Sequence, residues 1–187
     1  LLSPTAAVTD YVPELAGSGY RDATVRDILD MRSGVRFSEI YEDVHAEVRQ
    51  LDQAIGWVPR VDDWVPGSLY GYLPMLEAAR PHGGAFEYRS CETDVLGWVC
   101  ERAAGEEMPA LLSRLIWARI AEDDLDAGVD RAGTVFYDGG LSATLRDAAR
   151  FGEALRLSGV GASDVVPRAW IEDALTGAAD SREAFAQ

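Results

Sequence analysis

Two Thr-x-x-Asp sequences, each leading into apolar residues at helical spacing, constrain the fold of this chain more than any other feature. Thr24 with Asp27, and Thr144 with Asp147, match the capping box, in which a Thr and an acidic residue bond the free backbone N–H groups at the start of a helix. The apolar residues that follow recur three and four positions apart, as on the buried face of an amphipathic helix. We expect one helix after Thr24, closed by Gly34, and a second that begins at Thr144.

The rest of the pattern predicts a mainly α protein with a few short strands. Apolar spacing bounded by Pro and Gly predicts further helices over residues 67–80, 91–104, 108–120 and 167–175. Short alternating runs beside Gly-Gly pairs predict brief strands over residues 85–88 and 134–137. Residues 35–66 show no clean period, so we expect a long irregular segment there, of the kind that is often functional.

The chain contains no Lys, because all 17 basic residues are Arg. A lysine Schiff base, a Walker-A lysine or a Ser-x-x-Lys nucleophile pair therefore cannot be built from these residues alone. The net charge of −15 argues against nucleic-acid binding, which needs clustered positive charge. No apolar run approaches the ~18 residues of a membrane span. Cys91 and Cys100 lie in one expected helix and do not resemble a disulfide framework or a zinc site.

The two histidines lack the neighbours that catalysis or metal binding would need. No Gly-x-Ser-x-Gly elbow occurs, and neither His has carboxylates at metal-binding spacing, so we expect no metal site. His82 falls in a Pro-His-Gly-Gly turn, where we expect it to face solvent. His45 lies in an acidic segment, where we expect it to pair with Glu42 or Asp43. The acidic residues Glu122, Asp123, Asp124 and Asp126 are expected to form a solvated loop.

Three stretches resemble the motifs of one enzyme family in their order along the chain. They are Leu29-Asp30-Met31-Arg32-Ser33-Gly34, then Tyr88-Arg89-Ser90 at a helix start, then Gly139-Gly140 followed by Thr144, Asp147 and Ala149-Arg150. In this combination the sequence resembles the serine hydrolases of the class C β-lactamase-like fold. Within them it is most similar to the 6-aminohexanoate-dimer hydrolases. The similarity covers residues 9–170, and the 41–57 segment is its more specific part.

The resemblance implies a fold and a place for this chain within it. The fold would be the helical region of the α+β serine β-lactamase-like (DD-peptidase) fold without most of its antiparallel sheet, so we interpret residues 1–187 as one partial domain. The family's Ser-x-x-Lys nucleophile would lie upstream of Leu1, and its Lys/His-x-Gly strand beyond Gln187. We therefore expect this chain to be a piece of a longer protein and to be inactive by itself.

The resemblance also implies roles for five residues. Tyr88 matches the tyrosine of the family's second motif, whose phenol would move protons between the nucleophile, the leaving amine and water. Ser90 stands at the third position of that motif and would contact the substrate. Tyr41 and Asp52 match substrate-binding residues of the amide hydrolases, where Tyr41 would donate to the amide and Asp52 would hold a terminal ammonium. Asp138 is expected in the pocket wall.

Two departures from the family pattern bear on the substrate. β-Lactamases usually have Asn where this chain has Ser90, which weakens the β-lactamase interpretation, and a small residue is common where Arg89 stands. The expected reaction is acyl transfer to Ser and then to water, on a small linear amide such as a 6-aminohexanoate oligomer. A carboxylesterase, a β-lactamase or D-alanyl peptidase, and a non-catalytic ligand-binding relative are the alternatives.

Few partners are expected beyond the small-molecule amide or ester substrate. We expect no cofactor, no metal, no nucleic acid and no membrane partner. Because the cysteines do not pair, we expect a cytoplasmic protein. A homodimer is left open.

Overall fold

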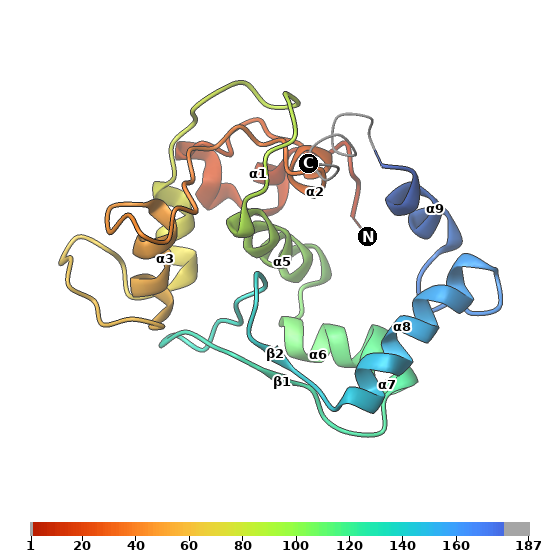
Figure 1. The fold of residues 1–187 in the computed structure, drawn as a ribbon. Helices are drawn as coiled ribbons and strands as arrows, with labels where there is room; N and C mark the ends of the chain where they lie inside the picture. The colour runs from red at the N-terminus through yellow and green to blue at the C-terminus, as the bar shows by residue number, and fades with distance from the viewer. Residues whose placement is uncertain (1, 178–187) are drawn as a thin grey trace. The chain divides into compact units, whose positions relative to one another are not determined.

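Helices dominate the computed structural model, which describes residues 2–177 (Figure 1). The chain divides into two compact units, here called unit 1 (Leu1–Glu106 and Gly128–Gly140) and unit 2 (Glu107–Ala127 and Leu141–Gln187). The helices of unit 1 are α1 (Val8–Tyr11), η1 (Pro13–Gly17), α2 (Val25–Leu29), α3 (Glu47–Ile55), α4 (Leu69–Tyr72), η2 (Leu73–Met75) and α5 (Ser90–Ala104). Unit 2 contains α6 (Met108–Leu112), η3 (Ser113–Trp117), α7 (Ala118–Ile120), β1 (Asp126–Ala127), β2 (Leu141–Ser142), α8 (Leu145–Gly159) and α9 (Arg168–Thr176). The expected mainly α content with short strands is confirmed.

The start of α2 shows the predicted capping box. Thr24 Oγ1 accepts from the Asp27 backbone N–H at 3.1 Å, and Asp27 Oδ2 accepts from the Thr24 N–H at 2.9 Å. The helix ends at Leu29, sooner than predicted, and Gly34 lies beyond it with a φ of 70°. A Cβ on Gly34 would come 2.4 Å from the Arg80 carbonyl oxygen. Gly34 therefore allows two chain segments to approach closely and does not close the helix.

Helix α3 contradicts the prediction that residues 35–66 are irregular throughout. Its side chains at helical spacing are buried in the core of unit 1, namely Val48, Leu51, Ala54 and Ile55. The helix has no polar capping side chain, because its N-cap is Ala46. It ends at Gly56, whose φ is 89°. Packing of the apolar face against the core thus stabilises a helix that lacks a start signal in the sequence.

The other differences from the predicted elements occur in short extended runs. Residues 67–80 form α4 and η2 only, after which Ala78 makes an antiparallel bridge to Val35. Residues 85–88 form no strand, and Val135 makes a single bridge to Val129 within the run 134–137. A strand needs a paired neighbour along its length, and these runs have at most one bridge each. Antiparallel pairing instead joins β1 and β2, with Asp126 opposite Ser142.

Helix α5 organises the core of unit 1. It packs against α1 and α2 (Figure 1), and its buried face includes Val95, Trp98 and Val99. Full burial of one such side chain contributes about 1.5–3 kcal/mol. The helix ends before Gly105 in the left-handed conformation, as predicted. Cys91 on α5 is free and buried beside the Tyr20 hydroxyl at 3.3 Å, and Cys100 is also free.

In unit 2, α6, η3 and α7 together fill the predicted helix over 108–120, and α8 begins after Thr144 as predicted. The Thr144 hydroxyl accepts from the Asp147 N–H at 3.2 Å. The Asp147 carboxylate accepts from the backbone N–H groups of Glu122 and Asp123, both at 3.0 Å. Only one half of the predicted capping box is therefore seen here, because Asp147 binds the acidic loop.

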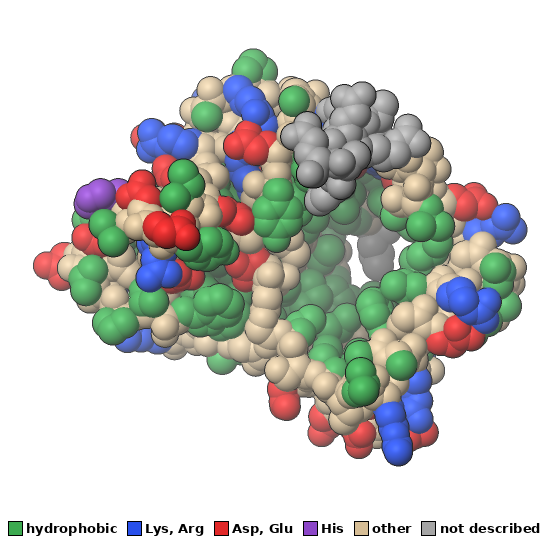
Figure 2. Space-filling model, viewed as in Figure 1, with side chains coloured by type: hydrophobic (Ala, Val, Ile, Leu, Met, Phe, Trp, Pro, Cys, Tyr) green, Lys and Arg blue, Asp and Glu red, His purple; other side chains and the backbone are tan. Residues whose placement is uncertain are grey.

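Charged side chains lie on the surface of each unit, with acidic groups interspersed with Arg (Figure 2). The side chains of Glu122, Asp123 and Asp124 are exposed, as predicted for a solvated loop. Within residues 2–177, none of the helices combines the length and the apolar character that crossing a bilayer requires.

Candidate functional site

Tyr88 lies in an extended segment just before α5, with 55% of its surface exposed. The next residue, Arg89, is buried and pairs with Glu87 at 2.6 Å, while its other nitrogen lies 3.9 Å from the buried Glu92 carboxylate. Successive side chains of an extended chain point in opposite directions. The inward Arg89 therefore directs the Tyr88 phenol outward.

Ser90 is the first residue of α5, and it connects Tyr88 to a residue that sequence reasoning missed. The Ser90 backbone N–H donates to Glu39 Oε1 at 2.5 Å. The Ser90 hydroxyl oxygen is buried and has no hydrogen-bond partner among the described residues. Glu39 precedes the 41–57 match by two residues, so only its nearness to Tyr41 in the sequence could have pointed to it.

The structure brings together four of the five predicted site residues and adds Glu39. The pKa of Tyr41 is raised by burial and then by the charges of nearby groups, namely Glu39, Asp52, Tyr88 and Asp138. Besides burial, the charges of Glu39 and Asp138 also raise the pKa of Tyr88. We call this group, Glu39, Tyr41, Asp52, Tyr88 and Asp138, the acidic site. Ser90 is held at its edge by Glu39. All of these residues belong to unit 1.

Helix α3 places Asp52 in the acidic site. Asp52 is buried and forms an ion pair of 2.6 Å with Arg49, one turn earlier on the same helix. Burial raises the pKa of Asp52, although the Arg49 guanidinium acts in the opposite direction. Asp52 is therefore a carboxylate with one positive partner already in place, unlike the surface charge that its helical position alone would suggest.

Asp138 lies in the turn that leads to Gly139-Gly140, and aromatic packing supports this turn. The Trp57 and Phe136 rings meet edge to face at 5.5 Å, and Trp57 lies beside Gly139. The backbone N–H of Asp138 donates to the Asp94 carboxylate at 3.3 Å. Burial raises the pKa of Asp138, and the charges of Asp52 and Glu39 raise it further.

The electrostatics of the acidic site favour the neutral phenol of Tyr88. Burial, followed by the charges of Glu39 and Asp138, raises the pKa of Tyr88 above its ordinary value. The pKa of Tyr41 is raised for the same reasons, with Asp52 also contributing. A phenol can accept a proton in catalysis only after it has lost its own. A positive charge next to Tyr88, which these carboxylates do not supply, would be needed to lower its pKa.

The two histidines lie outside the acidic site. The His82 ring nitrogens lie against the carbonyl oxygens of Ser33 and Arg21, the latter at 2.6 Å, and the residue is half-buried, so it faces solvent only in part. His45 is exposed, and its backbone N–H, not its ring, bonds the Asp43 carboxylate at 2.9 Å. In the described part of the chain, no three His, Cys, Asp or Glu side chains gather in a way that could hold a metal ion.

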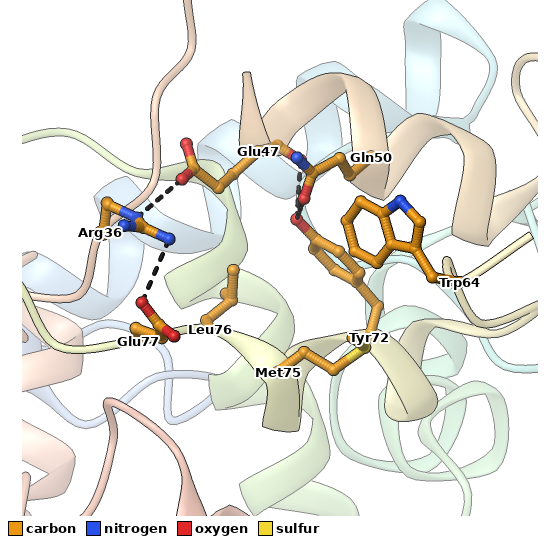
Figure 3. A pocket seen from close by; sticks show the side chains of 8 residues that line it. All are labelled: Arg36, Glu47, Gln50, Trp64, Tyr72, Met75, Leu76 and Glu77. Atoms are coloured by element: carbon orange, nitrogen blue, oxygen red, sulfur yellow. Dashed lines mark hydrogen bonds and ion pairs between the residues drawn. The ribbon is translucent and has the colours of Figure 1, made fainter. Parts of the chain in front are cut away.

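A pocket of about 260 Å³ in unit 1 contains none of the predicted site residues (Figure 3). Arg36 lies at one end between Glu47 and Glu77, at 3.0 and 3.2 Å, and Trp64 lies at the other end. The Tyr72 hydroxyl between them is bonded to α3 through the Glu47 carbonyl at 2.9 Å. The charged groups of this pocket, Arg36, Glu47 and Glu77, are paired with one another.

Comparison with known proteins gives consistent matches over almost the whole chain. Residues 1–186 match the family described as Beta-lactamase. A 6-aminohexanoate-dimer hydrolase from Paenarthrobacter ureafaciens is 40% identical over 98% of this chain. Among solved structures, a proposed 6-aminohexanoate-dimer hydrolase from Bacillus anthracis superposes with a TM-score of 0.80 over 92% of this chain, at 26% identity. A D-alanine carboxypeptidase from Burkholderia cenocepacia shares the fold, with a TM-score of 0.56 over 89% of this chain at 19% identity.

This chain spans about half the length of the relatives that it matches. It covers 46% of the Paenarthrobacter protein and 46% of the Bacillus protein, and 45% of the Burkholderia carboxypeptidase. This chain is rich in helix, in agreement with the fold predicted from the sequence.

Proposed function

The chain belongs to the beta-lactamase family, and on that premise we propose that it forms part of a serine hydrolase that cleaves linear amides through an acyl-enzyme. The proposed substrates are short oligomers of 6-aminohexanoate or amides of similar shape, with a free ammonium at one end. The 40% identity to a 6-aminohexanoate-dimer hydrolase supports this substrate class. The residues of the acidic site supply the physical argument.

The observation that carries the proposal is the excess of carboxylates around two tyrosines. Besides burial, the charges of Glu39, Asp52 and Asp138 raise the pKa of Tyr41, and among the described residues Arg49 pairs with Asp52. A partly buried group of this kind has a negative potential that a substrate ammonium would relieve. Charge-assisted hydrogen bonds to a carboxylate are also the stronger kind. The site is thus suited to a linear substrate with a positive end.

The catalytic steps would divide between this chain and the Ser-x-x-Lys segment that the resemblance implies. The serine oxygen would attack the amide carbon, and the C–N bond would break as the leaving nitrogen receives a proton. Water would then cleave the ester so formed. In this scheme the Tyr88 phenol would pass the proton from the serine to the leaving amine. The lysine of that segment would supply the positive charge that Tyr88 needs to act as a base.

The other residues of the acidic site would orient the substrate. The exposed Tyr41 hydroxyl would donate to the amide, and Asp52 and Glu39 would hold the ammonium. The buried Ser90 hydroxyl, which has no partner among the described residues, would bond a polar group of the substrate or of the segment that completes the site. Asp138 would form the wall on the Gly139-Gly140 side.

The proposal is tested by Asp52→Asn in the full-length protein that carries this segment. Loss of the carboxylate should cost about 1–3 kcal/mol in kcat/KM for 6-aminohexanoate oligomers, as expected when a charge-assisted hydrogen bond is lost. Uncharged short esters should be hydrolysed almost as before, because they have no ammonium for Asp52 to hold. Steady-state kinetics on both substrates provide the measurement.

A matched control is Glu153→Gln, which removes another carboxylate that pairs with an Arg three residues away on its helix. This substitution should leave kcat/KM unchanged for both the 6-aminohexanoate oligomer and the short ester. Equal losses on the amide and the ester in Asp52→Asn would remove the reason for preferring an amide hydrolase to a carboxylesterase. Absence of any turnover in the full-length protein would favour a non-catalytic relative.

A further inference from the structure

Asp94 holds the turn that carries Asp138. It lies on α5, four residues after Ser90, and is completely buried. Its Oδ1 atom accepts hydrogen bonds from the backbone N–H groups of Tyr137 at 2.8 Å and of Asp138 at 3.3 Å. One carboxylate therefore joins the helix that begins next to Tyr88 to the turn on the other side of the acidic site.

The remaining oxygens of this pair have no hydrogen-bond partner among the described residues. Asp94 Oδ2 and Asp138 Oδ1 are both buried and unpaired. The titratable groups that act on Asp94, or on which it acts, are Asp138, Tyr137, Tyr20 and Cys91, and none of them is a cation. Two ionised carboxylates in such surroundings would repel each other without compensation.

Protonation of one carboxyl group removes this repulsion. Burial, together with the Asp138 charge, raises the pKa of Asp94 to about 8. The pKa of Asp138 is raised by burial and by Asp52 and Glu39. Because Asp94 is the more deeply buried of the two, the proton belongs on Asp94. Asp138, which faces the acidic site, then carries the charge.

We propose that Asp94 and Asp138 act as one unit with a single negative charge, in which Asp94 is the positioning residue that holds Asp138 in the acidic site. The role of Asp138 toward a substrate rests on the proposed function, whereas the shared charge does not. Asp94 does not touch the substrate in this arrangement. Its two functions are to accept the Tyr137 and Asp138 N–H groups and to stay neutral at neutral pH.

The shared charge is tested by thermal unfolding of Asp94→Asn against pH. Asn keeps an oxygen that can accept both backbone N–H groups but carries no charge. Because the pKa of Asp94 is higher in the folded chain than its ordinary value of 3.8, the folded chain binds the extra proton, and its stability falls as pH rises from about 4 to 8. Asn at position 94 removes this dependence. The Tm of Asp94→Asn minus that of wild type should therefore grow by about 3 °C or more between pH 5 and pH 8.

A difference in Tm that stays constant over this pH range would overturn the shared charge, because Asp94 would then not titrate there. Asp62→Asn is a useful control in the same unit, since Asp62 bonds the Gln53 amide at 2.8 Å and lies outside the pair. Its Tm difference from wild type should not grow with pH in this way. The test uses no substrate, so its outcome is independent of the proposed function.

The positioning role is tested by comparing Asp94→Ala with Asp94→Asn in the full-length protein. Ala removes the acceptor for both N–H groups and frees the turn, so KM for a 6-aminohexanoate oligomer should rise about 10-fold with a smaller change in kcat. Asn should restore KM to within about 3-fold of wild type, because it restores the acceptor. A folded Asp94→Ala variant with unchanged KM would overturn the positioning role. If Asp94→Ala does not fold, an Asp94→Asn variant with KM raised as much as 10-fold would do so.

Discussion

Among single residues, Tyr88 is the one for which we propose a catalytic role. It is exposed at the start of α5, and its neighbours Arg89 and Ser90 are buried. In the full-length protein, Tyr88→Phe should lower kcat on amide substrates by about 100-fold or more, the scale expected for loss of acid–base catalysis. Single-turnover kinetics would measure the acylation step directly. An unchanged kcat would leave Tyr88 with a packing role only.

Gly97 on α5 shows how one residue fixes the turn near the acidic site. A Cβ at this position would lie 2.2 Å from the Tyr137 ring. Gly97→Ala should therefore displace Tyr137 and lower the free energy of unfolding by about 1–3 kcal/mol, as expected for overpacking. Gly152→Ala on α8 provides the control, because nothing lies within 4 Å of its Cβ. It should stabilise the protein by about 0.5–1 kcal/mol. Denaturant unfolding of both variants would measure the two changes in the free energy of unfolding.

At the scale of elements, the contact between Asp147 on α8 and the acidic loop makes a prediction about acid. Hydrogen bonds from the loop N–H groups of Glu122 and Asp123 and from Arg150 lower the pKa of Asp147 to about 2. A lowered pKa stabilises the folded chain above the ordinary value of 3.8, and this stabilisation is lost as pH falls toward 2. The Tm of Asp147→Asn should lie below that of wild type at pH 6. The gap should narrow between pH 4 and pH 2.

The control for this prediction is Glu172→Gln on α9, whose carboxylate forms a solvent-exposed pair with Arg168. Exposed pairs contribute little to stability, so its Tm should stay close to wild type. A gap for Asp147→Asn that is the same at pH 2 and pH 6 would mean that the loop contact does not depend on the ionised carboxylate.

The elements that the sequence predicts well are those with an apolar face and a clear signal at one end, either a start or a stop. Helices α5 and α8 have Gly105 or Thr144 at one end and were predicted close to their bounds. Helix α3 has the apolar face alone, since Ala46 cannot cap it, and acidic residues obscure the pattern around it. The strands expected over residues 85–88 and 134–137 were predicted wrongly for a different reason. Strand pairing depends on a neighbour distant in the sequence, and local alternation does not supply one.

The acidic site could be predicted only in part for a related reason. Tyr41, Asp52, Tyr88, Ser90 and Asp138 came from resemblance to a family. Their common location comes from the structure, with roles that stay predictions. Glu39 was missed because its link to the site is a bond to the Ser90 backbone, 51 residues away. The position of Asp94 relative to Asp138 likewise depends on the packing of α5 against the turn, which no local pattern encodes.

At the scale of the whole molecule, the two units differ in how much apolar surface they bury. Among the described residues, unit 2 has Leu111 and Ala154 as buried apolar side chains, and the other buried apolar side chains belong to unit 1. Burial of apolar surface is the main source of stability. The acidic site therefore belongs to the unit with the larger apolar core, unit 1. A site built on a well-packed scaffold keeps its side chains in place for binding.

We propose that the acidic site binds a linear amide through its positive end. The most direct measurement is kcat/KM of the full-length protein for the 6-aminohexanoate dimer and for the same dimer acetylated on its amine. Acetylation removes the ammonium and leaves the scissile amide unchanged. We predict that the acetylated dimer is cleaved with kcat/KM lower by about 10-fold or more, which corresponds to about 1.4 kcal/mol of lost binding. Equal values of kcat/KM for the two dimers would mean that the acidic site does not bind the ammonium.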